Sequence, residues 1–302
     1  MNNYTHIPVL LEESIKLLDI KAGGVYIDVT YGKGGHSKEI LNKLGNGRLI
    51  AFDQDSDIIK DDNIKTDERI TIINNNFRYI KNFIEYFNIK EVDGILGDLG
   101  ISSIHIDSPE RGFSTRYDAE LDMRMDRRKK LDAKTVINEY AEEKIIKILR
   151  EYGELPDAKR ISNAIIKTRQ QKEINTTYQL KECLSGCINT YNQEKFYAKV
   201  FQAIRIEVNQ ELEALKELLL QSYDILKTGG RIAIISYHSL EDRIVKNYFR
   251  SGNLEGNIEK DFYGNIKTTY KLITKKAIVA SEDELKRNNR ARSAKLRVAE
   301  KI

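Results

Sequence analysis

Short apolar segments alternate with helix-like segments over the first hundred residues, and this alternation constrains the fold more than any other feature of the sequence. The predicted strands are residues 25–30, 48–53, 70–73 and 92–99. The predicted helices, from the spacing of their apolar residues, are residues 9–18, 37–44, 55–60 and 77–87. Such alternation is typical of βαβ units, in which parallel strands form one sheet and right-handed crossovers place helices on both faces. The sequence therefore predicts an α/β fold.

The alternation stops after residue 100 and resumes near the C-terminus. Helical patterns dominate the segment between, at residues 136–152, 156–170, 178–190 and 195–226. A further strand is predicted at residues 229–236, followed by a hairpin in which residues 263–275 pair with residues 295–299 across a charged, mobile stretch. We therefore expect one sheet domain, residues 1–108 with 207–302, interrupted by an inserted all-helical domain at residues 109–206.

Composition limits the class of protein. The formal net charge of +4 does not demand a nucleic-acid partner, so any basic surface must be local. The two cysteines, Cys183 and Cys187, are spaced one helical turn apart without the further ligands that a metal site needs, and we expect no metal ion. No signal peptide and no apolar run of ~20 residues is recognisable, which predicts a cytoplasmic protein without a membrane partner.

The first predicted strand runs directly into the glycine-rich loop at residues 31–36. Glycines allow a ligand to approach the backbone, because no Cβ intervenes. Asp53 ends the second predicted strand, where a carboxylate can accept both ribose hydroxyls of an adenine nucleotide. The alternative for Asp53 is a helix N-cap. Loop and acid together favour a nucleoside-containing cofactor.

The spacing of the loop glycines bears on which cofactor this is. A dinucleotide loop reads G-x-G-x-x-G, whereas this loop continues G-K-G-G-H-S and lacks the third glycine. S-adenosylmethionine has no phosphate, and its sulfonium group favours a nearby carboxylate, which Asp98 supplies at the end of the fourth predicted strand. A nicotinamide-dependent oxidoreductase is the alternative enzyme class, and a non-catalytic RNA-binding assembly factor is the alternative outside enzymes.

The chain resembles a known family, the bacterial small-subunit ribosomal RNA methyltransferase H family. The matching segments run in family order over almost the whole chain: HIPVLLEE at 6–13, YIDVTYGKGGHS at 26–37, AFDQD at 51–55, DGILGDLGISS at 93–103, ERGFSTRYDAELDMRMD at 110–126, FQAIRIEVNQELE at 201–213, ISYHSLEDRIVK at 235–246 and RARSAKLRVAE at 290–300.

The resemblance implies a Rossmann-like class I methyltransferase sheet with a helical insert that helps to hold the substrate. It implies methyl transfer from S-adenosylmethionine to N4 of a cytidine in the decoding region of 16S ribosomal RNA, either naked or in the assembled 30S subunit. The implied cofactor-binding residues are Gly34, Gly35, His36, Asp53, Phe77, Asp98 and His105. Three departures stand out. His105 replaces a frequent glutamine, and Gly97 replaces a larger apolar residue, which would loosen the packing under the site. A shortened, charged stretch around residues 250–285 would alter the surface that meets RNA.

Transfer to an exocyclic amine needs positioning and a hydrogen-bond acceptor rather than a metal. Asp98 is the candidate acceptor, with the carbonyls of Leu99 and Gly100 as alternatives. Many amino-methyltransferases carry an aromatic residue in this loop, and this chain does not. The candidates to supply that residue from elsewhere are Phe113, Tyr117 and Tyr237.

His238 and Asp242 follow the strand at 229–236 at the same edge of the sheet, where they would orient the base or relay its proton. The alternative is that they cap the helix that follows. We expect Asp122 and Asp126 to hold the insert through ion pairs rather than to act in catalysis.

Two basic runs, residues 111–130 and 286–297, are candidate RNA surfaces, although such runs are often only solvated faces. The chain is also compatible with a homodimer.

Overall fold

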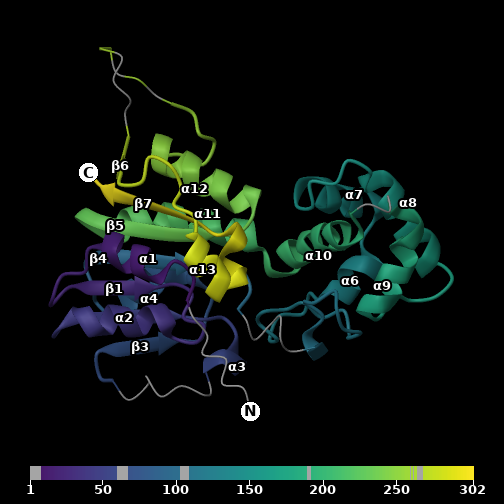
Figure 1. Ribbon diagram of the computed structural model, residues 1–302, viewed down its shortest axis with the longest axis horizontal. Helices are drawn as coiled ribbons and strands as arrows, with labels where there is room; N and C mark the ends of the chain where they lie inside the picture. The colour runs from purple at the N-terminus through teal and green to yellow at the C-terminus, as the bar shows by residue number, and fades with distance from the viewer. Residues whose placement is uncertain are drawn as a thin grey trace. The chain divides into compact units, whose positions relative to one another are not determined.

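The computed structural model describes residues 8–59, 67–102, 109–188, 192–258, 260, 262–263 and 268–302. The chain divides into two compact units (Figure 1). The sheet unit contains residues 1–100 and 212–302, and the helical unit contains residues 101–211. The domain boundaries predicted from the sequence were 108/109 and 206/207, and the assignment of substrate recognition to the helical unit remains a prediction.

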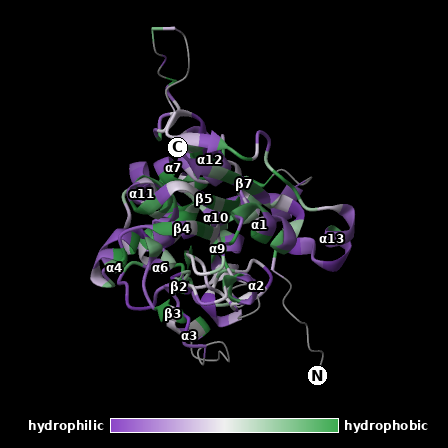
Figure 2. Cartoon of the chain, turned by 90° about the vertical axis from the view of Figure 1, so that its left-hand side faces the viewer, coloured by the Kyte–Doolittle hydropathy of each residue, from purple (hydrophilic) through white to green (hydrophobic). Residues whose placement is uncertain are grey.

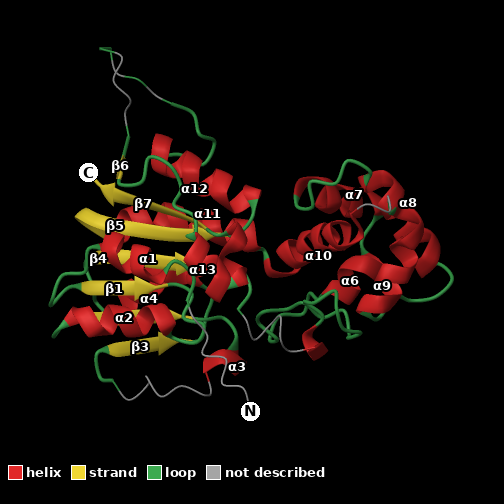
Figure 3. Ribbon diagram, in the orientation of Figure 1, coloured by secondary structure: helices red, strands yellow, loops and turns green. Residues whose placement is uncertain are grey.

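The sheet unit contains a seven-stranded sheet in the order β3-β2-β1-β4-β5-β7-β6. The strands are β1 (Val25–Asp28), β2 (Arg48–Phe52), β3 (Ile70–Ile73), β4 (Val92–Asp98), β5 (Leu226–Ser236), β6 (Tyr270–Leu272) and β7 (Lys295–Lys301). Strands β1 to β5 pair in parallel, and β7 runs antiparallel to both β5 and β6. The predicted α/β fold is confirmed (Figure 3). The order reverses at β1, between β1 and β4, and the carboxyl ends of the strands at such a reversal are where open parallel sheets commonly bind ligands.

Helices cover both faces of this sheet, as Figure 3 shows. They are α1 (Leu11–Leu18), α2 (Gly35–Leu44), α3 (Ser56–Ile59), α4 (Ile80–Tyr86), α11 (Glu211–Ile225), α12 (Ser239–Ser251) and α13 (Glu282–Arg287). Successive strand residues point to opposite faces. Tyr26 and Leu49 therefore belong to one buried cluster, with α1 and α2, and Ile27 and Ile50 to the other, with α4, α11 and α12. The short helix α13 is drawn largely in the hydrophilic colour in Figure 2.

The helical unit contains α6 (Ala133–Glu139), α7 (Glu142–Glu151), α8 (Ala158–Arg169), α9 (Thr177–Leu184) and α10 (Gln193–Asn209), which enclose one apolar core. The single helix predicted at 136–152 is wrong, because Tyr140 is extended and separates α6 from α7. The single helix predicted at 195–226 is also wrong. Gln210 adopts a left-handed conformation with φ of 54°, which ends α10 one residue before α11 begins.

The predicted C-terminal hairpin is confirmed in its pairing, since β6 pairs with β7 from Tyr270↔Lys301 to Leu272↔Ala299. The stretch between these strands was predicted to be mobile, but it contains α13 and a 3-10 turn at Asn289–Ser293. None of the helices in the described part of the chain has the length and apolar character that a membrane crossing requires.

Candidate active site

Three carboxylates lie at the carboxyl ends of three adjacent parallel strands. Asp28 ends β1, Asp98 ends β4, and Asp53 directly follows β2. Burial raises the pKa of Asp28 to about 6 and the pKa values of Asp53 and Asp98 to about 7, and the charge of Asp28 contributes to both of the latter shifts. Among the described residues, no lysine, arginine or histidine pairs with any of the three. This edge of the sheet therefore holds negative charge without a protein counter-ion, which suits a cationic ligand.

The glycine loop is built around Asp53. Gly32 and Gly34 have φ of 55° and 73°, values that favour glycine, and Gly34 caps α2 without a side-chain hydrogen bond. The backbone N–H of Gly32 donates to Oδ2 of Asp53 at 2.9 Å, and that of Asp55 donates to Oδ1 at 2.9 Å. The carboxylate thus holds the loop to the end of β2. Each of its oxygens still has a lone pair for a ligand hydroxyl.

Asp28 is the member of the site that sequence reasoning missed. Its side chain is fully buried, accepts a hydrogen bond from Ser37 Oγ at 2.6 Å and another from the N–H of Thr30 at 3.1 Å. Thr30 Oγ1 in turn accepts from the N–H of Asp98 at 2.6 Å. Asp28 therefore connects the start of α2, the loop after β1 and the end of β4. The available signal was an ionisable residue inside an apolar strand, immediately before the glycine loop.

Tyr237 contacts Asp98 from the end of β5. Its hydroxyl donates to Oδ1 of Asp98 at 2.6 Å. Its ring lies against Gly100, where a Cβ would be 3.5 Å from the ring atom Cδ2. Of the three aromatic residues that sequence reasoning offered for this place, Tyr237 is the one in the same unit as Asp98. Phe113 and Tyr117 belong to the helical unit.

His238 is the N-cap residue of α12, and its side chain is 9% exposed. Its Nε2 lies 3.3 Å from Oε1 of the buried Glu241, and neither ring nitrogen forms a hydrogen bond with any described residue. The Asp242 carboxylate accepts from Arg297 Nε at 2.6 Å and from Lys295 Nζ at 3.3 Å, both on β7. Although burial raises the pKa of Asp242, the hydrogen bond from Arg297 and the two positive charges hold it below its usual value. The capping alternative therefore describes His238, whereas Asp242 pairs with β7 instead of capping α12.

The remaining residues that were predicted to bind the cofactor differ in where they lie and in what they contact. Phe77 begins a 3-10 turn (Phe77–Tyr79) after β3 and packs against the apolar cluster beneath the sheet. The His36 ring is buried and lies 3.2 Å from the carbonyl oxygen of Val9, so this side chain contacts the N-terminal segment. Gly35 packs against Pro8, where a Cβ would come within 2.2 Å of Cγ. His105 lies outside the described residues.

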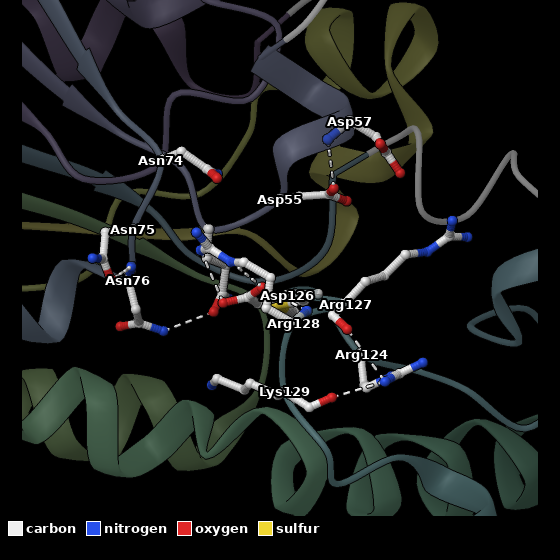
Figure 4. Close-up of polar contacts among 12 residues, drawn as sticks. Asp55, Asp57, Asn74, Asn75, Asn76, Arg124, Asp126, Arg127, Arg128 and Lys129 are labelled. Carbon is white, nitrogen blue, oxygen red and sulfur yellow. Dashed lines mark hydrogen bonds and ion pairs between the residues drawn. The ribbon is translucent and has the colours of Figure 1, made fainter.

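Polar contacts beside β2 and β3 fix the surrounding loops, and Figure 4 shows part of them. Asn74 Nδ2 donates to the carbonyl oxygen of Asp53 at 3.0 Å, and Asn76 Nδ2 donates to Oε1 of Gln54 at 2.8 Å. Asp55 accepts from the N–H of Asp57 at 2.9 Å. These bonds are local to the loops after the two strands and hold Asp53 in place.

Gly97 was expected to loosen the packing beneath the site, and this expectation is wrong. A Cβ at Gly97 would lie 2.9 Å from Val29 Cγ2 and 3.0 Å from Ile234 Cδ1. The branched side chains of the neighbouring strands already fill the space.

The basic run at 111–130 is partly structural. Arg111 is buried and donates to the carbonyl oxygens of Arg124 and Met125. Asp122 pairs with Arg124 at 2.7 Å. Asp126 pairs with Arg128 at 2.8 Å (Figure 4), so both aspartates form ion pairs as predicted. In the second run, Lys286, Arg287, Arg290 and Arg292 are exposed. We call these four residues the C-terminal basic patch.

Comparison with known proteins gives consistent matches. A model of the MraW methylase family matches residues 3–302. The ribosomal RNA small subunit methyltransferase H of Flavobacterium johnsoniae is 54% identical over 298 residues, which cover 98% of each chain. The protein of the same name from Cytophaga hutchinsonii is 53% identical over 98% of this chain and 99% of its own. Among solved structures, a Streptococcus mutans putative methyltransferase in complex with SAH is 11% identical, with a TM-score of 0.46, over 98% of this chain and 100% of that chain.

Proposed function

The chain belongs to the MraW methylase family, and from this premise we propose that it transfers a methyl group from S-adenosylmethionine to N4 of a cytidine in the decoding region of small-subunit ribosomal RNA. The observation that carries the proposal is the cluster of Asp28, Asp53 and Asp98 beside a glycine loop. The first of these carboxylates is fully buried and the other two are partly buried, and burial raises the pKa of each. The relatives named for small-subunit ribosomal RNA support the choice of substrate.

The described residues fit this cofactor. Asp53 would accept the ribose hydroxyls with the lone pairs that its two backbone donors leave open. Gly34 and Gly35 would let the cofactor approach the backbone at the start of α2, and Phe77 would flank the adenine. The negative charge of Asp98 and Asp28 would favour the sulfonium centre. When bound, the cofactor supplies a methyl group that is open to attack by a nucleophile.

Asp98 is the residue that we place at the target amine. One of its oxygens accepts from Tyr237, and the other would accept an N4 hydrogen. This acceptor would favour the tetrahedral nitrogen that attacks in line, about 3 Å from the methyl carbon. The carbonyl groups of Leu99 and Gly100 are the alternative acceptors. The amine must also lose a proton, and His238 is a candidate to relay it because its imidazole lies one residue beyond Tyr237 and is nearly buried.

Asp242 has an indirect role in this proposal. Its two partners on β7 hold the first turn of α12, and that turn positions Tyr237 and His238. We therefore propose that Asp242 positions the site rather than touching the base.

The C-terminal basic patch and the exposed part of residues 111–130 are the surfaces that we propose for RNA. Phosphate contacts would fix the RNA without reading its sequence, and a single-stranded base would reach Asp98 at the carboxyl edge of the sheet. The substrate is then naked ribosomal RNA or the assembled 30S subunit, in the cytoplasm, and a homodimer would be compatible with either.

The test is transfer of labelled methyl groups from S-adenosylmethionine to unmodified small-subunit RNA and to 30S subunits, with identification of the modified nucleoside by mass spectrometry. We expect N4-methylcytidine with the wild-type protein and none with Asp98→Ala. Asp224→Ala is the control, because Asp224 pairs with Lys81 at the surface.

Retained turnover in Asp98→Ala would remove Asp98 from both proposed roles. Cofactor binding without any turnover by the wild-type protein would favour the non-catalytic assembly factor, and a titration that showed preference for a nicotinamide cofactor would favour the oxidoreductase.

A further inference from the structure

Tyr237 lies at the point where β5 ends and α12 begins. It follows Ser236, the last residue of β5, and its hydroxyl donates to Oδ1 of Asp98 at the end of the neighbouring strand β4. At 2.6 Å this is a short hydrogen bond, as expected when the acceptor is a carboxylate. The contact joins two strand ends at the sheet edge where the cofactor loop lies.

Both partners of this hydrogen bond are held by their own backbones. The N–H of Asp98 donates to Thr30 Oγ1 at 2.6 Å, and the N–H of the next residue, Leu99, donates to the carbonyl oxygen of Ile235 at 2.9 Å. The backbone of Asp98 is therefore held to the loop after β1, and the next residue is held to β5.

Glu241 holds the other partner. It is 3% exposed, lies in the first turn of α12, and accepts the N–H of Tyr237 at 2.9 Å and that of His238 at 3.4 Å. Buried donors at a strand end need such an acceptor, because an unpaired N–H costs about as much as a lost hydrogen bond. The acidic residue thus sets the direction in which Tyr237 leaves the strand.

We propose that Tyr237 is a positioning residue for methyl transfer. Its hydroxyl occupies one oxygen of Asp98, so that the other oxygen faces the target amine. Its ring, packed on Gly100, forms the aromatic side of the substrate site, which residues 98–101 do not supply. This inference rests on the proposed function, because it assigns the amine to Asp98.

The chemistry of the phenol suits this role. Burial, together with the neighbouring charge of Asp98, raises the pKa of Tyr237 far above its usual value, so the hydroxyl keeps its hydrogen throughout the range in which the enzyme works. A phenol has one hydrogen to donate, and Asp98 receives it. An asparagine in this place would offer two donor hydrogens instead of one.

The hydrogen bond from Tyr237 also affects the pH range in which Asp98 can accept the amine hydrogen. Burial raises the pKa of Asp98 to about 7, and the bond from Tyr237 opposes that increase, whereas the charges of Asp28 and Glu241 add to it. Glu284 on α13 is a further carboxylate whose charge acts on Tyr237. An ionised Asp98 is needed to accept the amine hydrogen. Removing the hydroxyl should therefore move the acid limb of activity to higher pH.

The experiment is the pH profile of methyl transfer by Tyr237→Phe, which removes the hydroxyl and keeps the ring. A hydrogen bond to a charged group changes an equilibrium by about tenfold or more, so the acid limb of kcat should rise by about one pH unit. At pH 7 the ionised fraction of Asp98 should fall from about one half to about one tenth, so kcat should fall about fivefold. The KM for S-adenosylmethionine should change little, and activity should recover toward pH 9. Tyr248→Phe is the matched control, because the buried Tyr248 on α12 contacts Tyr270 rather than the site.

The proposal is overturned if Tyr237→Phe has the wild-type pH profile and kcat, or if its loss of activity does not recover at high pH and parallels a loss of folding seen by circular dichroism. The assay counts methyl groups on total small-subunit RNA. It therefore tests Tyr237 even if the wild-type protein modifies an atom other than cytosine N4, an outcome that would contradict the proposed function separately.

Discussion

Asp98→Asn should make the ligand-free protein more stable at pH 8 while abolishing its activity. The asparagine keeps an oxygen that can accept from Tyr237, and it removes a charge that is buried beside Asp28. The pKa of Asp98 is raised from an ordinary value of 3.8 to about 7 in the folded protein. The folded state therefore binds this proton more tightly than the unfolded state, and the free energy of unfolding falls as pH rises from about 4 to about 7.

The magnitude follows from the size of this shift. A shift of roughly three pH units corresponds to about 4 kcal/mol at 1.36 kcal/mol per unit. Solvent screening reduces this figure because the Asp98 side chain is only partly buried, and we expect about 2 kcal/mol at pH 8. For a chain of 302 residues that gain raises the melting temperature by roughly 3 °C.

Thermal melts of the ligand-free wild type and Asp98→Asn at pH 5 and pH 8 would measure the effect. We expect a small gain in melting temperature for the variant at pH 5, about a third of the gain at pH 8, because the free energy of unfolding of the wild type has only begun to fall there. Asp67→Asn provides a control of opposite sign, because the hydrogen bonds from Arg69 lower the pKa of Asp67 to about 2 and stabilise its charged form. A variant that was less stable at pH 8, or equally stabilised at both pH values, would refute the reasoning.

Three further predictions follow from particular contacts. Gly35→Ala should displace Pro8 from the start of α2, since the new Cβ would come within 2.2 Å of Cγ, and calorimetry should show at least tenfold weaker binding of S-adenosylhomocysteine. Asn209→Ala should lower the free energy of unfolding by about 2–3 kcal/mol, measured by denaturant titration, because the buried N–H of Met125 and carbonyl of Met123 both lose their partner. Binding to ribosomal RNA, measured by filter binding, should weaken with salt with a log–log slope of about −0.7 per phosphate contacted, and replacing the C-terminal basic patch with glutamine should flatten that slope. An affinity for RNA that does not change with salt concentration would argue against this surface.

The sequence predicted the sheet well because its signal is local. Each parallel strand is a short apolar run bounded by polar or glycine residues, and β1 to β4 were all placed from that pattern. The helix boundaries at Tyr140 and Gln210 were missed, since neither break carries a glycine or proline. In the second case Gln210 takes up a left-handed conformation, which glutamine does not favour and which no local pattern in the sequence predicts.

The residues of the site divide in the same way into those that a local sequence pattern predicts and those that it does not. Asp53 and Asp98 could be placed because both lie at the carboxyl ends of predicted strands, and the carboxyl ends of parallel strands meet at one edge of the sheet. The choice of Tyr237 among three aromatic residues could not be made, because it depends on the register of β5 beside β4. The pairing of Asp242 with Arg297 joins residues far apart in the chain, and the burial of Arg111 depends on the fold of the helical unit. These contacts are tertiary, and no local pattern encodes them.

The central claim is methylation of cytosine N4 in small-subunit ribosomal RNA with Asp98 at the amine. The most direct measurement is mass mapping of that RNA from cells that carry the gene, lack it, or lack it and express either the wild type or Asp98→Ala. We predict an N4-methylcytidine in the decoding region that disappears without the gene and returns with the wild type only. An RNA whose methylation is unchanged by loss of the gene would contradict the claim.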